Sequence, residues 1–182
     1  MEVGVRPIHG GPCSPFIDIA VYPQAREVKP IVIPGHGSFE LENVVLDLNG
    51  TITESGEFIP GVVEGFEALS RAGFRIFVLS GDTKGTLAQT FKDFPYIQAV
   101  LTEKAQDKRT FVESIGPERT VCVGNGNIDV EMFKVARLSL CTIQGEGSSK
   151  KAMLEADIVV THIKHAMEIL LDPQKLIATL RS

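Results

Sequence analysis

Three groups of polar residues end or follow short apolar runs of this 182-residue chain, and together with one lysine they could transfer a phosphoryl group. Asp47 lies in VVLDL, Ser80 ends FRIFVLS, and Asp129 comes shortly after RTVCVG. Lys108 lies before RTVCVG, in the helix-like segment AQDKRTFVESIG. One carboxylate would attack, the hydroxyl and the ammonium group would bind phosphate oxygens, and the second carboxylate would help bind Mg²⁺.

The elements that must position these residues are strands and helices that alternate from about residue 44 onward. The predicted strands are VVLDL, FRIFVLS, QAVLT, RTVCVG, LSLCTI and DIVV. The predicted helices between and after them are GVVEGFEALSRAG, KGTLAQTFKDF, AQDKRTFVESIG, NIDVEMFKVA, SSKKAMLEA and HAMEILLDPQKLIATLRS. Continuous apolar strands indicate a parallel sheet that helices cover on both faces, so we predict a three-layer, Rossmann-like α/β sandwich. The site of such a fold lies at the carboxyl ends of the strands.

Two parts of the chain differ in composition. Residues 1–30 hold five of the ten prolines and show no lasting period, which predicts an irregular N-terminal arm. Residues 31–182 are expected to form one core domain. A β-hairpin should open this domain, because IVI and FELE flank the turn-rich PGHGS.

Composition and charge exclude several classes of protein. Apolar residues make up 43% of the chain and charged residues 23%, as is typical of a globular body. The net charge of −5 argues against nucleic acid and against an anionic membrane surface as partners. No apolar run approaches the ~20 residues that span a bilayer, and MEVGVRPIHGG lacks the apolar core of a signal peptide. The three cysteines form no CxxC pair and fit a reducing compartment, so we expect a cytoplasmic protein.

Taken in order, DLNGT, SGD, Lys108 and GNGNID resemble the four motifs of the haloacid dehalogenase (HAD) superfamily. The branch that they resemble consists of soluble relatives of the P-type ATPase phosphorylation domain, whose members read VVLDLNGT, GNG and EADIVV. The resemblance covers roughly residues 31–182, and four ordered motifs are a specific signal. It implies a HAD-like fold and a Mg²⁺-dependent hydrolase of the phosphatase type that acts through an aspartyl-phosphate.

The resemblance also implies roles for the residues that match its motifs. Asp47 is the nucleophile and a Mg²⁺ ligand, and the backbone carbonyl of Asn49 is a second ligand. Ser80 and the backbone N–H of Gly81 bind phosphoryl oxygens. Lys108 pairs with Asp47 and offsets the charge that builds on the phosphoryl group.

The remaining matches concern the metal and the loop after the nucleophile. Gly50 allows a sharp turn there, and Thr51 supports the loop and, like Gly81, is assigned to cofactor binding. Asn125 takes the position of a direct metal ligand. Asp129 takes that of a ligand or of a residue that holds metal-bound water.

Three assignments have competitors. Lys104 competes with Lys108, but the spacing within KRTFVESIG favours Lys108 and predicts that Lys104 is solvated. Asp82 is interpreted as the cap of the helix that begins near Lys84. The glycine-rich GEGSSKK lacks the spacing of a phosphate-binding P-loop and is expected to be an ordinary loop that borders the site.

One departure from the family pattern concerns proton transfer. Most HAD phosphatases carry a second aspartate two residues after the nucleophile, which protonates the leaving group and then activates water. Asn49 can do neither, and such help is worth about 10²–10⁴ in rate. We therefore expect slow turnover or a substrate with a good leaving group.

Two other departures concern the metal site. Asn125 replaces an aspartate and brings an oxygen ligand without charge, so Mg²⁺ affinity should be reduced. Ile128 stands where the family commonly has asparagine. The branch shares Asn49 and Asn125, but it does not explain Ile128.

The intervals from Asp47 to Ser80 and from Ser80 to Lys108 are too short for the inserted cap domain that usually selects the substrate. TITESGEF can form only a small flap, so we predict a capless core. An open site suits a phosphorylated macromolecule, or a small phosphorylated molecule covered by a neighbouring subunit in a homo-oligomer.

Two functions follow from these residues. The first is a phosphohydrolase, phosphatase or ATPase-like, that acts through phospho-Asp47 on an unknown phosphate ester or on ATP. The second is a HAD-fold binding or regulatory protein with weakened catalysis, which Asn49, Asn125 and Ile128 favour. An ion pump is disfavoured, because neither a membrane segment nor a nucleotide-binding insertion is present.

Overall fold

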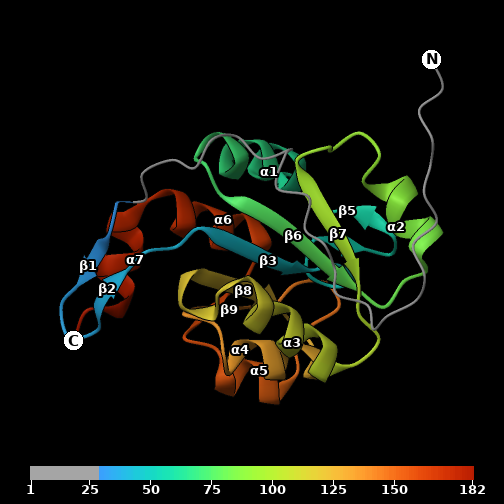
Figure 1. Ribbon diagram of the computed structural model, residues 1–182. Coiled ribbons are helices and arrows are strands. Elements are labelled where there is room, and N and C mark those ends of the chain that lie inside the picture. The colour runs from blue at the N-terminus through green and yellow to red at the C-terminus, as the bar shows by residue number, and fades with distance from the viewer. Residues whose placement is uncertain (1–28) are drawn as a thin grey trace, which may run out of the picture.

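A six-stranded parallel sheet forms the centre of the computed structural model, which describes residues 29–182 (Figure 1). In space the strands follow the order β10-β9-β8-β3-β6-β7. Their bounds are β3 Asn43–Asp47, β6 Arg75–Ser80, β7 Ile97–Leu101, β8 Thr120–Gly124, β9 Leu138–Thr142 and β10 Ile158–Val160. The arm predicted for residues 1–30 lies outside the described residues, apart from its last two positions.

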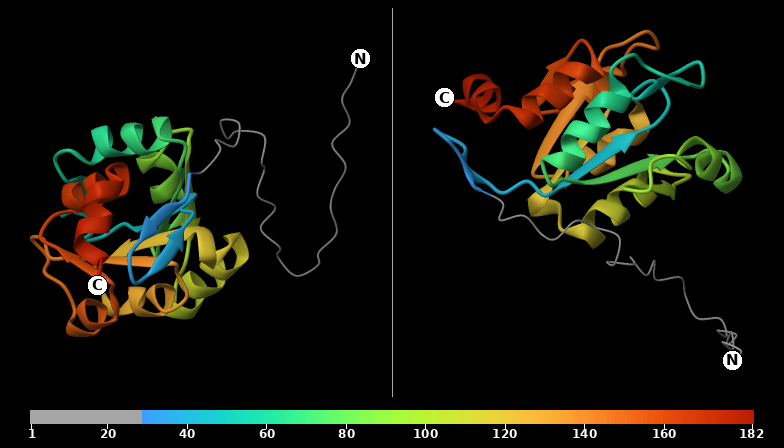
Figure 2. Two further views of the ribbon diagram at one scale, coloured as in Figure 1. Left: turned by 90° about the vertical axis from the view of Figure 1, so that its left-hand side faces the viewer. Right: turned by 90° about the horizontal axis from the view of Figure 1, so that it is seen from above.

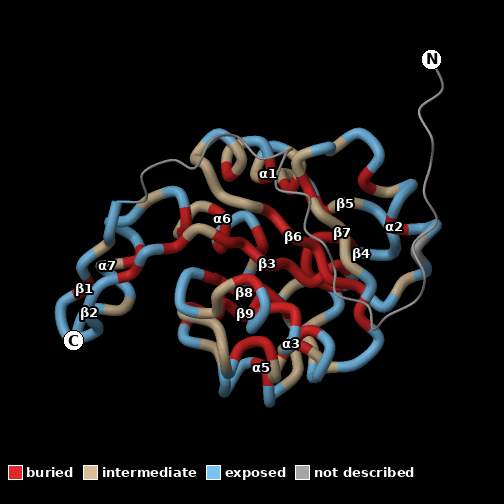
Figure 3. Tube along the Cα trace, in the orientation of Figure 1, coloured by how far each residue is buried: buried red, intermediate tan, exposed pale blue. Residues whose placement is uncertain are grey.

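Helices cover both faces of this sheet and confirm the three-layer α/β sandwich (Figures 1 and 2). One face packs against α1 (Val62–Arg71), α2 (Lys84–Thr90) and α6 (Ile163–Leu171), and α7 (Pro173–Leu180) packs on α6. The other packs against α3 (Ala105–Ile115), α4 (Val130–Phe133) and α5 (Lys150–Glu155). The central strands are therefore buried on both sides, as Figure 3 shows for β3, β6 and β8.

The register of the central strands aligns their carboxyl ends. Asp47 of β3 pairs with Leu79 of β6, and Leu46 pairs with Val123 of β8. Each of these three strands ends within about one residue of the same level. The loops that follow them therefore meet at one edge of the sheet, as expected of a parallel α/β fold.

Two helices differ from their predicted extent. The segment predicted as NIDVEMFKVA forms a short 3₁₀ helix, Asn127–Asp129, and then the single turn of α4. The C-terminal tail forms two helices instead of one, because Pro173 cannot continue the hydrogen bonding of α6. The carboxylate of Asp172 caps the new helix by accepting the backbone N–H of Gln174 at 3.0 Å.

Two small antiparallel hairpins complete the described residues. β1 (Ile31–Ile33) and β2 (Gly37–Phe39) form the predicted leading hairpin, which packs beside α7 at one end of the molecule (Figure 2). The guanidinium of Arg137 lies 3.6 Å above the ring of Phe39 and donates to the carbonyls of His36 and Ser38, which fastens the hairpin to the core.

β4 (Thr53–Glu54) and β5 (Glu57–Phe58) form the small flap. Between β3 and β6 the chain contains only this flap and α1, and between β6 and α3 only α2 and β7. The core is therefore capless, as the spacing predicts. Within residues 29–182, every helix is too short or too polar to cross a membrane.

Candidate active site

Three charged side chains meet at the carboxyl edge of the sheet. The Nζ atom of Lys108, from α3, lies 2.5 Å from Oδ1 of Asp47 and 2.7 Å from Oδ1 of Asp129. The side chain of Lys108 is 1% exposed, that of Asp129 is 0% exposed and that of Asp47 is 11% exposed. Only the nucleophile candidate therefore reaches solvent.

Burial controls the protonation of this cluster. Burial and then the negative charge of Asp129 raise the pKa of Asp47 to about 7, against the positive charge of Lys108 and the hydrogen bonds that Lys108 and Thr51 donate. Burial alone would lower the pKa of Lys108, but the two carboxylates outweigh it and raise that pKa. Lys108 is therefore held in its charged form.

The backbone positions Asp129 on the side away from Lys108. Its Oδ2 atom accepts the N–H groups of Asn125 and Gly126, both at 2.9 Å. A Cβ atom at Gly124 would collide with the Asp129 carboxylate, so the end of β8 has room only for glycine. These contacts fix both oxygens of Asp129 in the buried floor of the site.

Thr51 joins the nucleophile to Asn125. Its Oγ1 atom lies 3.2 Å from Oδ2 of Asp47 and 3.1 Å from Oδ1 of Asn125. The amide nitrogen of Asn125 donates to the carbonyl of Gly147 at 3.1 Å, which turns the amide oxygen toward Thr51. Oxygens of Asp47 and Asn125 therefore converge on one hydroxyl, and the prediction that Thr51 supports this loop agrees with the geometry.

These oxygens fit a hard divalent cation. Carboxylate, amide and backbone carbonyl oxygens are the ligands that Mg²⁺ takes in proteins. Across the described part of the chain, no three His, Cys, Asp or Glu side chains are grouped to hold a metal ion. A cation here would therefore depend on Asn125 and on backbone oxygen, in addition to Asp47.

Gly50 turns the chain directly after the strand, with φ of 75°. A side chain here would be strained, and its Cβ would lie 2.5 Å from Nδ2 of Asn125 and 2.9 Å from Oε2 of Glu146. The sharp turn predicted at Gly50 is present, and it brings the loop that follows β9 against the nucleophile loop.

Ser80 and Gly81 lie at the end of the neighbouring strand β6, as the sequence predicts. Ser80 is 2% exposed, and its Oγ atom accepts the backbone N–H of Asp82 at 3.1 Å. This arrangement leaves the hydroxyl with its own hydrogen to donate. Gly81 is exposed, so its backbone is open to a ligand from solvent.

Asp82 does not cap α2, which corrects the prediction from the sequence. Thr83 is the N-cap residue, and its Oγ1 atom accepts the backbone N–H of Thr86 at 3.4 Å. The carboxylate of Asp82 instead accepts a hydrogen bond from Nδ2 of Asn49 at 3.4 Å. The helix takes the next residue as its cap and leaves Asp82 facing the nucleophile loop.

The structure also distinguishes Lys108 from its competitor Lys104, and it shows the surroundings of two cysteines. Lys104 is exposed, whereas Lys108 contacts both carboxylates, as the spacing predicts. Cys122 and Cys141 are buried, and burial raises the pKa of both thiols, so they are packing residues rather than nucleophiles.

Sequence reasoning missed Gln144, which holds the nucleophile loop from behind. Its Nε2 atom donates to the carbonyls of Thr51 at 2.7 Å and Gly50 at 3.2 Å, and its Oε1 atom accepts the N–H of Ile163 at 2.8 Å. Gln144 lies in the loop that follows β9, at the same edge of the sheet as Ser80 at the end of β6. The signal that could have identified Gln144 is its place just after the carboxyl end of a predicted strand, where the site of such a fold lies.

The loop predicted to border the site does so. The backbone N–H of Ser149 and the hydroxyl of Ser148 both donate to the carbonyl of Asn125, at 2.8 and 2.9 Å. Ser148 and Ser149 therefore hold Asn125, the candidate metal ligand, in place from the outer side.

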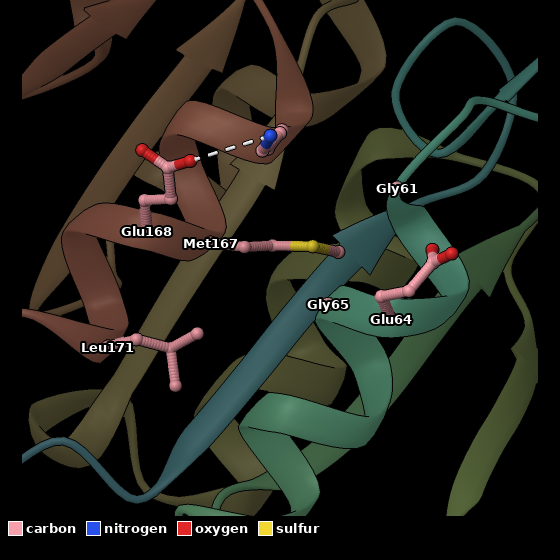
Figure 4. Close-up of a pocket in the computed structure, with 7 residues that line it drawn as sticks. Gly61, Glu64, Gly65, Met167, Glu168 and Leu171 are labelled. Atoms are coloured by element: carbon pink, nitrogen blue, oxygen red, sulfur yellow. Dashed lines mark ion pairs between the residues drawn. The ribbon is translucent and has the colours of Figure 1, made fainter.

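A groove of about 370 Å³ lies between α1 and α6 (Figure 4). Met167 reaches across it to Gly65, where a Cβ atom would collide with the methionine. Glu64 and the Lys164–Glu168 pair are also among its lining residues. The groove shares no lining residue with the site around Asp47, so the two are separate features.

Comparison with known proteins yields relatives, although no family model matches the chain. Over 142 residues the chain is 29% identical to a soluble P-type ATPase-like phosphatase of Methanocaldococcus jannaschii. This match covers 74% of the chain and 51% of that protein, so the chain spans about half the length of this relative. Over 64 residues it is 41% identical to an uncharacterized protein of the same organism, a match that covers 35% of the chain and 69% of that protein.

Solved structures share the fold. A cobalt-bound deoxy-D-mannose-octulosonate 8-phosphate phosphatase from Haemophilus influenzae matches with a TM-score of 0.62 at 17% identity, over 78% of the chain and 94% of that structure. The corresponding phosphatase from Moraxella catarrhalis, in complex with magnesium and phosphate ions, matches with a TM-score of 0.62 at 11% identity, over 76% of the chain and 90% of that structure. With these motifs in order at one edge of the sheet, the chain is similar in sequence to a soluble P-type ATPase-like phosphatase and shares the fold of these solved phosphatases.

Proposed function

We propose that the chain is a Mg²⁺-dependent phosphohydrolase that forms an aspartyl-phosphate on Asp47. The observation that carries this proposal is the buried contact of Lys108 with both Asp47 and Asp129. A lysine and two carboxylates held together at one edge of the sheet are costly to bury and suit a charged ligand. The phosphatase relatives support the same chemical class.

Each residue of the site has its own role in the proposed reaction. Asp47 attacks the phosphorus atom through the one carboxylate of the cluster that reaches solvent. Lys108 offsets charge on the phosphoryl oxygens, and Ser80 and the N–H of Gly81 bind those oxygens. These donors are fixed before the substrate arrives, so they act in the transition state without reorganisation.

A divalent cation complements this set. Asp47, Asn125 and the carbonyl of Asn49 would hold it, and Asp129 would hold its water. When bound, the cation supplies positive charge that neutralises the phosphoryl group. Among the relatives by fold, one structure contains cobalt and another contains magnesium with phosphate, which supports a divalent metal.

The substrate follows from the capless architecture only as a class. We expect a phosphorylated macromolecule, or a phosphorylated small molecule that a neighbouring subunit covers. A homo-oligomer of this kind and a cytoplasmic location remain predictions.

The test is phosphate release from p-nitrophenyl phosphate and from ATP, with and without Mg²⁺. Wild type should release phosphate only with Mg²⁺, and Asp47→Asn should abolish release. Asp93→Asn is the matched control, because Asp93 is exposed on the surface and should keep the wild-type rate. Equal release by wild type and Asp47→Asn would contradict the proposal.

A HAD-fold binding protein is the second candidate, and Asn49 is the observation that favours it. If neither wild type nor Asp47→Asn releases phosphate, this candidate takes precedence. Partner capture would then be the next experiment.

A further inference from the structure

The carboxamide of Asn49 is held between two partners. Its Nδ2 atom donates to Oδ1 of Asp82 at 3.4 Å, and its Oδ1 atom accepts from Oγ1 of Thr53, also at 3.4 Å. Position 49 is where the resemblance expects a proton-transferring aspartate. The carboxylate of Asp82 is therefore hydrogen-bonded to residue 49, the position where the family pattern has an aspartate and this chain has Asn49.

The backbone fixes where Asp82 stands. Asp82 directly follows Ser80 and Gly81, and its N–H donates to Oγ of Ser80 at 3.1 Å. Its side chain has no role in capping α2, because Thr83 performs that task. Asp82 is also partly exposed, so water can reach its carboxylate.

On the basis of the proposed function, we propose that Asp82 is the general base for hydrolysis of phospho-Asp47, with Asn49 as its positioning residue. A water oxygen forms a bond to phosphorus, and the bond between phosphorus and the Asp47 oxygen breaks. That electron pair returns to Asp47 as its carboxylate. The water proton passes to the carboxylate of Asp82 and then to solvent.

Two other carboxylates lie near the exposed side of the site, and their contacts differ from those of Asp82. Glu146 lies against Gly50, and Glu54 lies against Gly145. Both are exposed, and among the described residues Asp82 is the one carboxylate with a hydrogen bond to Asn49. Glu146→Gln therefore provides a control that removes a nearby negative charge without touching the Asn49–Asp82 pair.

The experiment separates formation of the phosphoenzyme from its breakdown. The probe is ³²P-labelled acetyl phosphate with Mg²⁺, whose good leaving group needs no proton. Acid quenching then measures how fast the label appears on the protein and, after a chase with unlabelled probe, how fast it is lost. Thermal unfolding of each variant confirms that it is folded.

Asp82→Asn should form the phosphoenzyme at the wild-type rate and lose it more slowly by about 10²-fold or more, the scale of general-base help. Glu146→Gln should leave both rates unchanged. Asn49→Asp combined with Asp82→Asn should restore breakdown, because a carboxylate returns to position 49. A merely structural role for Asp82 would not give this rescue.

Two results would overturn the inference, and they are distinguishable. If wild type is labelled on Asp47 and Asp82→Asn loses the label within about threefold of the wild-type rate, or if both rates fall together, Asp82 is not the base. If wild type neither traps label nor releases phosphate, the proposed function fails and this inference fails with it.

Discussion

Lys108 shows how three residues set the electrostatics of the site. One lysine and two carboxylates form a buried cluster with a formal charge of −1, and a divalent cation would change it to +1. The metal-free cluster therefore attracts a cation, and the cluster with its cation attracts a phosphoryl group. This order of binding follows from charge alone, since buried charges interact strongly in a low dielectric.

Replacing Lys108 should destabilise the protein as well as inactivate it. Lys108→Met would leave Asp47 and Asp129 buried side by side without a counter-charge, which costs roughly 3–5 kcal/mol. Urea unfolding without metal measures this loss, and added Mg²⁺ should recover part of it.

Lys104→Met is the matched control, because Lys104 is exposed four residues earlier on the same segment. It should change the free energy of unfolding by less than about 0.5 kcal/mol. Equal losses in the two variants would mean that the ion cluster contributes nothing specific.

At the scale of elements, the end of β8 and the turn after it form one unit. The strand ends at Gly124, the 3₁₀ helix Asn127–Asp129 begins three residues later, and Asp129 folds back onto two backbone N–H groups. This return explains why the helix predicted here is short. The chain uses the segment to aim a carboxylate at Lys108 rather than to build a long helix.

Gly124→Ala should disrupt that unit. The added Cβ would collide with the Asp129 carboxylate, and overpacking of this kind costs roughly 1–3 kcal/mol. We also expect weaker Mg²⁺ binding, because Asp129 would move away from the site. Thermal unfolding and a Mg²⁺ titration measure the two effects.

Gly126→Ala is the control for this prediction. Its Cβ would lie 3.6 Å or more from Asp129 and its neighbours, which is ordinary van der Waals contact, and its φ of −102° suits alanine. If Gly126→Ala lowered Mg²⁺ binding as much as Gly124→Ala, the crowding argument would be wrong.

At the scale of the whole molecule, the site depends on segments that lie far apart in the chain. Helix α3 and the loops after β6, β8 and β9 each contribute a residue that contacts Asp47, at the end of β3, or the loop that follows it. The small flap is the only element inserted between β3 and α1, so solvent reaches Asp47 directly. A ligand that joins these segments should therefore stabilise the whole fold.

Beryllofluoride with Mg²⁺, which imitates a phosphorylated aspartate, should raise the midpoint of thermal unfolding. At a concentration of 100 times Kd the gain is about 2.7 kcal/mol, which is roughly 5–10 °C for a chain of this size. Asp47→Asn should lose this shift, and Asp93→Asn should keep it. No shift in the wild type would show that the segments do not assemble a phosphoryl site.

The sequence by itself determined the layers of the fold and the order of the motifs. Both follow from local pattern, since continuous apolar runs mark buried parallel strands and the strand-end rule then places Asp47, Ser80 and Asp129 at one edge. The capless core followed from the spacing of the same residues. The catalytic roles remain predictions, although the structure brings the residues together.

Only the tertiary structure decided which side chains contact one another across the loops. Asn49 and Asp82 are 33 positions apart, so local pattern offers a helix cap for Asp82 and says nothing of Asn49. Gln144 is 93 positions from Thr51, and its role depends on the loop after β9 reaching the nucleophile loop. The physical reason is that strand and helix signals are local, whereas hydrogen bonds between loops exist only once the sheet has brought its edges together.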